Sequence, residues 1–173
     1  MELSEFVDWV WMHQSSEHGF ADGCANGGYG FISVKTTDSW RDVSFKYPEE
    51  EVVVPEVEGD LYFTPNLFVE DRRRKELMLP SRWLYADCDT VYPGSSQYPD
   101  PTVLWETSPK RYQAMWLCPV ALKPREHQII NKRLTYMIGA DKGGWDATQV
   151  LRIPGTRNYK YDGRPEVTIQ WVR

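Results

Sequence analysis

The sequence contains no long apolar run and few cysteines. Without a stretch of about 18 or more apolar residues no membrane-spanning helix is expected, and the acidic start at 1–5 lacks the basic region of a signal peptide. The three cysteines, Cys24, Cys88 and Cys118, are widely spaced and form neither a Cys-x-x-Cys motif nor a zinc pattern with the histidines. These absences favour a reducing, cytoplasmic location and no membrane partner.

Basic residues are scarce in the first part of the chain. Residues 1–71 contain 15 acidic and 3 basic residues, a balance of −12, whereas residues 72–173 contain 10 and 17, a balance of +7; together they give the net charge of −5. This asymmetry suggests a local polyanion site beside an acidic surface, and a patchy solvated surface is the alternative. We expect one domain over 1–173, with an acidic scaffold (1–71) and a basic, motif-bearing part (72–173), either complete or as a fragment of a longer protein.

Aromatic residues are abundant, with eight tryptophans and ten tyrosines. The apolar content as a whole is ordinary for a globular protein. Most of the aromatic rings are therefore expected in the core, and the alternative for some is a stacking platform for nucleic-acid bases.

Hydrophobic periodicity predicts an α+β fold. Helical spacing occurs at 3–13 and 124–138, and 71–79 is either a short helix or a charged loop. Strands are expected at 30–35, 42–47, 61–68, 83–89, 103–107, 112–117, 149–153 and 167–172. The order of strand, hairpin, helix and strand from residue 83 onward suggests a sheet with helices on one side.

Two carboxylates end an apolar strand at 83–89. Asp87 and Asp89 are two residues apart, so they project from one face about 7 Å apart, whereas Cys88 points into a core. Two ionised carboxylates repel each other unless a cation lies between them, and Mg²⁺ typically binds one or two carboxylates together with phosphates. Glycosyltransferases, phosphatases and surface turns also contain Asp-x-Asp, so these alternatives stay open for the motif alone.

A second stretch follows the turn at Ser108. Alternation along the next strand puts Arg111 and Gln113 on one face. A fixed cation and an amide donor can hold phosphate oxygens, and the alternative is a surface arginine after a turn.

A third stretch contains three phosphate-type donors around a bend. Arg152 ends a strand, 154–156 reads Pro-Gly-Thr, and Asn158 and Lys160 follow on alternating positions. A β-turn explains the bend, but it does not explain the three donors around it. Arg152, Asn158 and Lys160 can therefore converge on one polyanion.

Taken in this order, the three stretches resemble the archaeo-eukaryotic primase superfamily, which comprises the primase-polymerases of plasmids, phages and archaea. Within this superfamily they are similar to the plasmid RepB-type and phage-like branch. The family pattern is an apolar strand ending in Asp-x-Asp, a Ser-x-x-x-x-His strand, and a carboxylate before Arg-x-Pro-Gly-x-x-Asn-x-Lys, and the resemblance covers residues 83–160. It implies an α+β primase-polymerase catalytic core, in which helices pack on an antiparallel sheet like that of RNA-recognition motifs.

The resemblance also implies roles for individual residues. The catalytic metal ligands for Mg²⁺ or Mn²⁺ would be Asp87, Asp89 and Asp141, with Asp146 as the alternative third ligand. The residues that bind the incoming nucleotide would be Ser108, Arg111, Gln113, Arg152, Asn158 and Lys160. Many members have histidine where this chain has Gln113, which can donate a hydrogen bond but carries no charge. The Thr-Ser-Pro…Tyr-Gln form is similar to the RepB-type branch.

The function implied is that of a template-dependent nucleotidyltransferase, a DNA primase and polymerase using two-metal-ion attack of a 3′-hydroxyl on the α-phosphate. The partners would be a single-stranded or primed DNA template, nucleotide triphosphates and a helicase domain or protein, in the cytoplasm of a host of a phage or plasmid. Two alternatives remain: a catalytically inactive module that binds nucleic acid or nucleotide, and a metal-dependent nuclease using the same carboxylates.

Overall fold

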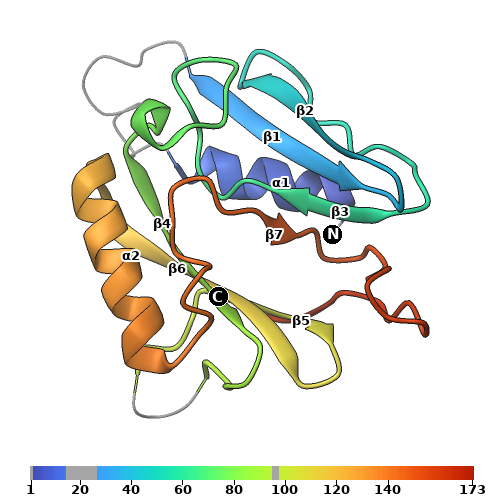
Figure 1. Ribbon diagram of the computed structural model, residues 1–173. Helices are drawn as coiled ribbons and strands as arrows, with labels where there is room; N and C mark the ends of the chain where they lie inside the picture. Colours follow the sequence, from blue (N-terminus) through green and yellow to red (C-terminus); the bar gives the residue numbers. More distant parts are fainter. Residues whose placement is uncertain (1, 15–26, 95–97) are drawn as a thin grey trace.

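The computed structural model describes residues 2–14, 27–94 and 98–173, which form two four-stranded sheets and two α-helices (Figure 1). The elements are α1 (Leu3–Met12), β1 (Gly28–Lys35), β2 (Trp40–Tyr47), β3 (Asp60–Phe63), the 3₁₀ turn η1 (Lys75–Leu77), β4 (Ser81–Cys88), β5 (Val103–Ser108), β6 (Arg111–Leu122), α2 (Pro124–Ile138), β7 (Leu151–Arg152) and β8 (Thr168–Val172). The predicted α+β class is confirmed. No helix of the described ranges is long and apolar enough to span a membrane.

The strands form two separate antiparallel sheets. The first has the order β2-β1-β3-β7 and the second the order β4-β6-β5-β8. The sequence patterns predicted one sheet from residue 83 onward, and four of the strands expected there form the second sheet. The strand expected at 149–153, however, forms β7 of the first sheet, which was not predicted as a distinct sheet. Its last strand, β7, comes from the basic part of the chain and pairs with β3 from the acidic part. The two parts are therefore joined within one sheet.

The main core lies between the two sheets and α1. Ile32 and Val34 of β1 are buried on the face of the first sheet that belongs to this core. Phe6 of α1 packs edge-on against Phe63 at 5.6 Å and against Trp105 of the second sheet at 5.8 Å between ring centroids. The expectation that most large rings fill the core is confirmed for these residues.

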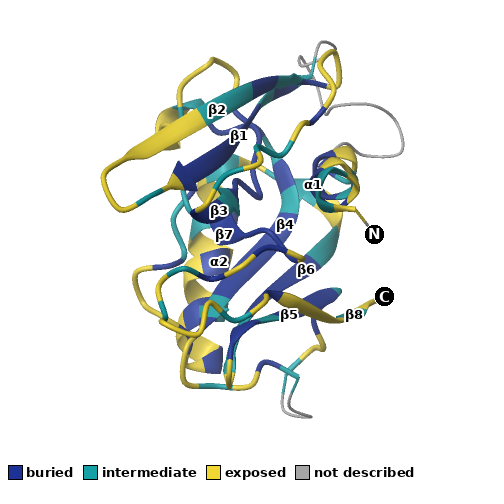
Figure 2. Ribbon diagram, turned by 90° about the vertical axis from the view of Figure 1, so that its right-hand side faces the viewer, coloured by how far each residue is buried: buried dark blue, intermediate teal, exposed yellow. Residues whose placement is uncertain are grey.

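A smaller core lies between the second sheet and α2. Ala86, Cys88 and Ala114, which alternate with the residues of the main core, pack there with Ile138 of the helix. Cys88 is completely buried, as the alternation predicted. Figure 2 shows α2 with its buried side toward this sheet and its other side exposed. Because Ala86 and Cys88 at the end of β4 are small, the helix can approach this end of the strand closely.

The helices agree with the sequence and some strand ends do not. The second helix begins at Pro124, which suits a first helical position, and ends before Gly139, whose φ of 74° closes the helix in the left-handed conformation. The strand expected at 61–68 stops at Phe63, because Pro65 cannot donate to a ladder. Of the segment 71–79, only the short turn η1 is helical.

Candidate active site

The end of β4 gathers the three predicted carboxylates. Asp87 faces Gln113 across the ladder between β4 and β6. After α2 the chain returns to this point, where the backbone N–H of Asp141 donates to the backbone oxygen of Asp87 at 2.8 Å. Asp89 lies one residue beyond β4 and is exposed. Two segments that are distant in sequence therefore meet at one corner of the molecule.

The surroundings of Asp87 favour its protonated form. Burial, the largest cause, raises the pKa of Asp87 to about 6, and the negative charge of Asp89 and then that of Asp141 add to the rise. A hydrogen bond from Gln113 and the positive charge of Arg152 oppose it. A partly buried carboxyl among like charges is typical of sites that bind cations or transfer protons.

Asp146, the alternative third ligand, lies in the same loop as Asp141 but has other partners. Its carboxylate accepts hydrogen bonds from the N–H and hydroxyl of Thr148 at 2.8 and 2.7 Å and pairs with Lys75 at 3.2 Å. Burial alone would raise the pKa of Asp146, but these partners outweigh burial and lower it. In the part of the chain that the structure describes, no three metal-ligating side chains surround one point.

Gln113 connects Asp87 to the first sheet. Its amide nitrogen donates to the carboxylate of Asp87 at 3.3 Å. Its amide oxygen accepts two hydrogen bonds, from the backbone N–H of Arg152 at 2.8 Å and from the indole of Trp105 at 3.2 Å. A protonated histidine could accept neither bond. The structure therefore explains why an uncharged amide, which both donates and accepts, suits this position.

Arg152 is held in a buried ion pair. Its guanidinium lies 2.5 Å from Asp60, and both side chains are less than a tenth exposed. Asp60 also accepts the backbone N–H of Tyr159 at 2.7 Å, and the guanidinium carbon lies 4.7 Å from the centroid of the Tyr62 ring. Burial first, with added contributions from the charges of Asp60 and Asp87, raises the pKa of Tyr62 to about 12. Tyr62 therefore lies within the field of the carboxylate site.

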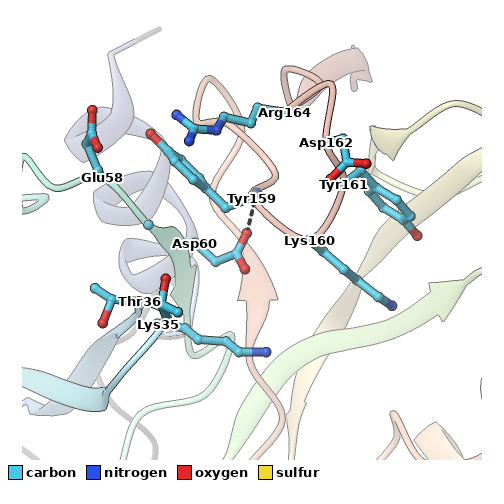
Figure 3. Close-up of a pocket in the computed structure, with 11 residues that line it drawn as sticks. Lys35, Thr36, Glu58, Asp60, Tyr159, Lys160, Tyr161, Asp162 and Arg164 are labelled. Carbon is cyan, nitrogen blue, oxygen red and sulfur yellow. Dashed lines mark hydrogen bonds between the residues drawn. The ribbon is translucent and has the colours of Figure 1, made fainter.

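Asn158 and Lys160 take different positions. The side chain of Asn158 is buried, donates to the backbone oxygen of Thr107 at 2.8 Å and accepts the backbone N–H of Lys160 at 3.1 Å. The side chain of Lys160 lines a pocket of about 450 Å³. Figure 3 shows Asp60 in the wall of this pocket, between Lys35 of β1 and Lys160 of the loop after β7. Asn158 thus fixes the loop that carries the lysine.

Ser108 and Arg111 flank the turn between β5 and β6. The Arg111 guanidinium pairs with Asp89 at 2.8 Å, with both side chains partly exposed. Ser108 is 4% exposed, and its hydroxyl has no hydrogen-bond partner among the described residues. A buried hydroxyl without a partner is unfavourable by about 1–3 kcal/mol, so a bound group or water at this point would stabilise it.

Two residues of this region, Asp60 and Tyr62, are not predicted from the sequence. Asp60 contributes there only to the charge of the acidic part, and Tyr62 only to a predicted strand. The available signal was a charged residue at the first position of the apolar strand β3. That signal is weak alone, because it does not reveal that Arg152, 92 positions later, is the partner.

Asp87→Asn is expected to stabilise the protein above about pH 6 and to have no effect on stability below about pH 4. The folded pKa of about 6 exceeds the ordinary aspartate pKa of 3.8, so the stability that Asp87 contributes is lost as the pH rises between these values. The variant should exceed the wild type in free energy of unfolding by about 2–3 kcal/mol at pH 7. Urea denaturation without metal, at pH 4 and pH 7, measures this difference; a difference that does not depend on pH would contradict the prediction.

Comparisons with known proteins agree with this geometry. Residues 72–173 match the family described as RepB DNA-primase N-terminal domain. The AEP domain of the primase-polymerase of cyanophage S-2L is similar with a TM-score of 0.65 and 10% identity, covering 84% of this chain and 82% of that one. The catalytic domain of primase RepB′, crystallised with initiator DNA, has a TM-score of 0.58 and 19% identity, covering 84% and 77%.

A second structure of primase RepB′ has a TM-score of 0.62 and 16% identity, and the match covers 99% of this chain and 57% of that one. No curated protein matches the chain. At such low identities the structural likeness shows the fold alone, whereas the family match spans more than half of the chain and includes all three motif stretches. The chain therefore belongs to the RepB DNA-primase N-terminal domain family and is a primase-family catalytic domain.

Proposed function

We propose that the domain is a template-dependent nucleotidyltransferase, a DNA primase-polymerase that joins a 3′-hydroxyl to the α-phosphate of a nucleotide triphosphate. The observation that carries the proposal is the position of Asp87, whose pKa is raised by burial and by the charges of Asp89 and Asp141, opposite the cation of Arg152. Carboxylates beside a fixed cation suit a reaction between metal-bound phosphates and a hydroxyl. The RepB′ relative crystallised with initiator DNA supports DNA as the template.

We propose that Asp87, Asp89 and Asp141 hold Mg²⁺ or Mn²⁺, although among the described residues these carboxylates do not yet surround one point. Their oxygens are the ligands that these ions prefer, and the mutual repulsion that raises the pKa of Asp87 would be relieved by a cation. When bound, the ions supply charge neutralisation at the phosphates and activation of the attacking hydroxyl. Asp89 would exchange its ion pair with Arg111 for the metal, which leaves the guanidinium to contact phosphate.

Two groups of residues act on the nucleotide in different ways under this proposal. Arg111 and Lys160 are accessible cations that contact the triphosphate, and Ser108 offers it an unpaired hydroxyl. Arg152 adds a buried positive charge, held in place by Asp60. These groups hold negative charge in a fixed geometry before the reaction begins.

Gln113 and Asn158 already bond to the protein. Gln113 orients the carboxylate of Asp87 through its amide nitrogen. Asn158 holds the loop after β7 against β5 and so positions Lys160. Under the proposal both residues serve the nucleotide by positioning these neighbours.

A primed DNA template with deoxynucleotide triphosphates and Mn²⁺ tests the function against its two rivals. Extension of the primer supports a polymerase. Binding that is sensitive to salt but leaves the primer unchanged would indicate an inactive module. Shortening of either strand would indicate a nuclease with the same carboxylates, and either of these outcomes would overturn the proposal.

Two neighbouring substitutions distinguish the third ligand. Asp141→Asn should lower the rate of extension by about 100-fold or more, the loss typical of a group that stabilises transition-state charge. Asp146→Asn should leave the rate unchanged and cost at most about 1 kcal/mol of stability, because the remaining oxygen can still accept from Thr148 and only the partly exposed ion pair with Lys75 is lost. The measurements are extension rate and the rise of melting temperature with Mn²⁺, which Asp141→Asn should remove. The reverse pattern would assign the ligand to Asp146.

A further inference from the structure

The first sheet has one face that packs in the main core and an opposite face that carries polar and aromatic side chains. The register places Lys35 opposite Trp40, and Ser33 opposite both Asp42 and Tyr62. Alternation along each strand then puts these five side chains on the same face. Tyr62 lies opposite Arg152 of the neighbouring strand β7. This face of the sheet therefore extends from the edge strand β2 to Arg152, beside the carboxylate site.

Trp40 is stacked but largely uncovered. Its ring lies 5.3 Å from the ring of Tyr62 between centroids, at an interplanar angle of 25°, and the residue is 47% exposed. The same Tyr62 ring lies under the guanidinium of Arg152. The first residues of β2, which include Trp40, are coloured as exposed in Figure 2. Trp40 and Tyr62 therefore form an accessible aromatic surface that begins at Arg152, near Asp87, and ends at the exposed ring of Trp40.

Cations lie beside this exposed ring. Lys35 is exposed directly opposite Trp40 in the ladder. On the other side, Arg73 donates to Asp42 at 3.1 Å and to the backbone oxygen of Thr148 at 2.7 Å, which fixes the segment 72–74 over the same face. Arg72 and Arg74 are exposed, and within the described ranges their side chains form no ion pair or hydrogen bond.

We propose that this platform, formed by Trp40, Tyr62, Lys35, Arg72 and Arg74, binds the single-stranded DNA template. One base stacks on the exposed face of Trp40, and the adjacent phosphates contact the lysine and the two arginines. Proteins that bind single-stranded DNA without sequence preference commonly use aromatic side chains that alternate with cationic ones. The rings stack on bases, since every base has a π-face, and the cations contact the phosphates. The inference rests on the proposed function, since it leads the template toward the carboxylates.

Stacking and phosphate contacts are separable with two oligonucleotides of equal length, oligothymidylate and an abasic deoxyribose phosphate chain. Trp40→Ala should weaken binding of oligothymidylate by about 5- to 150-fold and leave binding of the abasic chain unchanged, because only the former has bases to stack. Arg72→Ala with Arg74→Ala should weaken both and lower the salt slope by about 1.4. Both affinities are measured without metal or nucleotide.

Three controls make the result decisive. Trp40→Phe keeps a ring and should retain most of the affinity, and melting temperatures report whether each variant is folded. Tyr136→Ala removes another exposed ring, 52% accessible on α2, and should change neither affinity. Equal weakening of both oligonucleotides by Trp40→Ala, or no binding by the wild type, would overturn the platform.

The outcomes also distinguish this inference from the proposed function. If the wild type extends primers while Trp40→Ala binds oligothymidylate like the wild type, the platform is wrong and the polymerase stands. If the oligonucleotides behave as expected but no primer is extended, the platform stands and the catalytic proposal fails.

Discussion

Asp87→Asn is expected to abolish primer extension without harming the fold. The substitution removes one charge and keeps the shape of the side chain, so an oxygen remains to accept the hydrogen bond from Gln113. The negative charge that would hold the metal at the end of β4 is lost. We expect the rate to fall by about 1,000-fold or more, at the upper end of what one charge-stabilising group contributes.

The stability of this variant makes the result easy to interpret. Because ionised Asp87 is unfavourable in the folded protein at neutral pH, the Asn variant should be more stable than the wild type there. Loss of activity can then not be attributed to unfolding. Extension rates at pH 7.5 with Mn²⁺, beside melting temperatures with and without the ion, provide the measurement. A variant that extends primers at the wild-type rate would remove Asp87 from the active site.

Arg152→Met should cost about 3–5 kcal/mol of stability, the largest effect expected on the fold. The substitution leaves the carboxylate of Asp60, which is 4% exposed, buried without its cation. Removing one partner of a buried pair is far more costly than removing both. The double variant Asp60→Asn with Arg152→Met should therefore recover much of the loss, since an asparagine at position 60 can still accept the backbone N–H of Tyr159.

Chemical denaturation of the single and double variants tests this expectation. If the double variant were no more stable than Arg152→Met alone, the pair would not be the source of the loss. Both variants should fail to extend primers at temperatures where they are folded, because Arg152 also supplies positive charge near the phosphates under the proposed function. Full activity of the folded double variant would show that Arg152 serves only the fold.

Local patterns in the sequence determined most of the helices and strands and the family of the chain. Apolar spacing predicted the helix at 124–138, and strand alternation predicted that Cys88 is buried while Asp87 points to the other face. The motif order predicted the primase family, which the match over 72–173 confirms. These predictions succeed because periodicity and short motifs involve residues only a few positions apart.

Only the tertiary structure decided which distant residues became partners. The pairing of Asp60 with Arg152 and the stack of Trp40 on Tyr62 depend on strand register in a sheet that the sequence patterns did not reveal. Gln113 was expected to face a phosphate, yet its amide joins Asp87 to the backbone of β7. Register is set by the packing of the whole core, because a slip by one residue would turn every side chain to the opposite face.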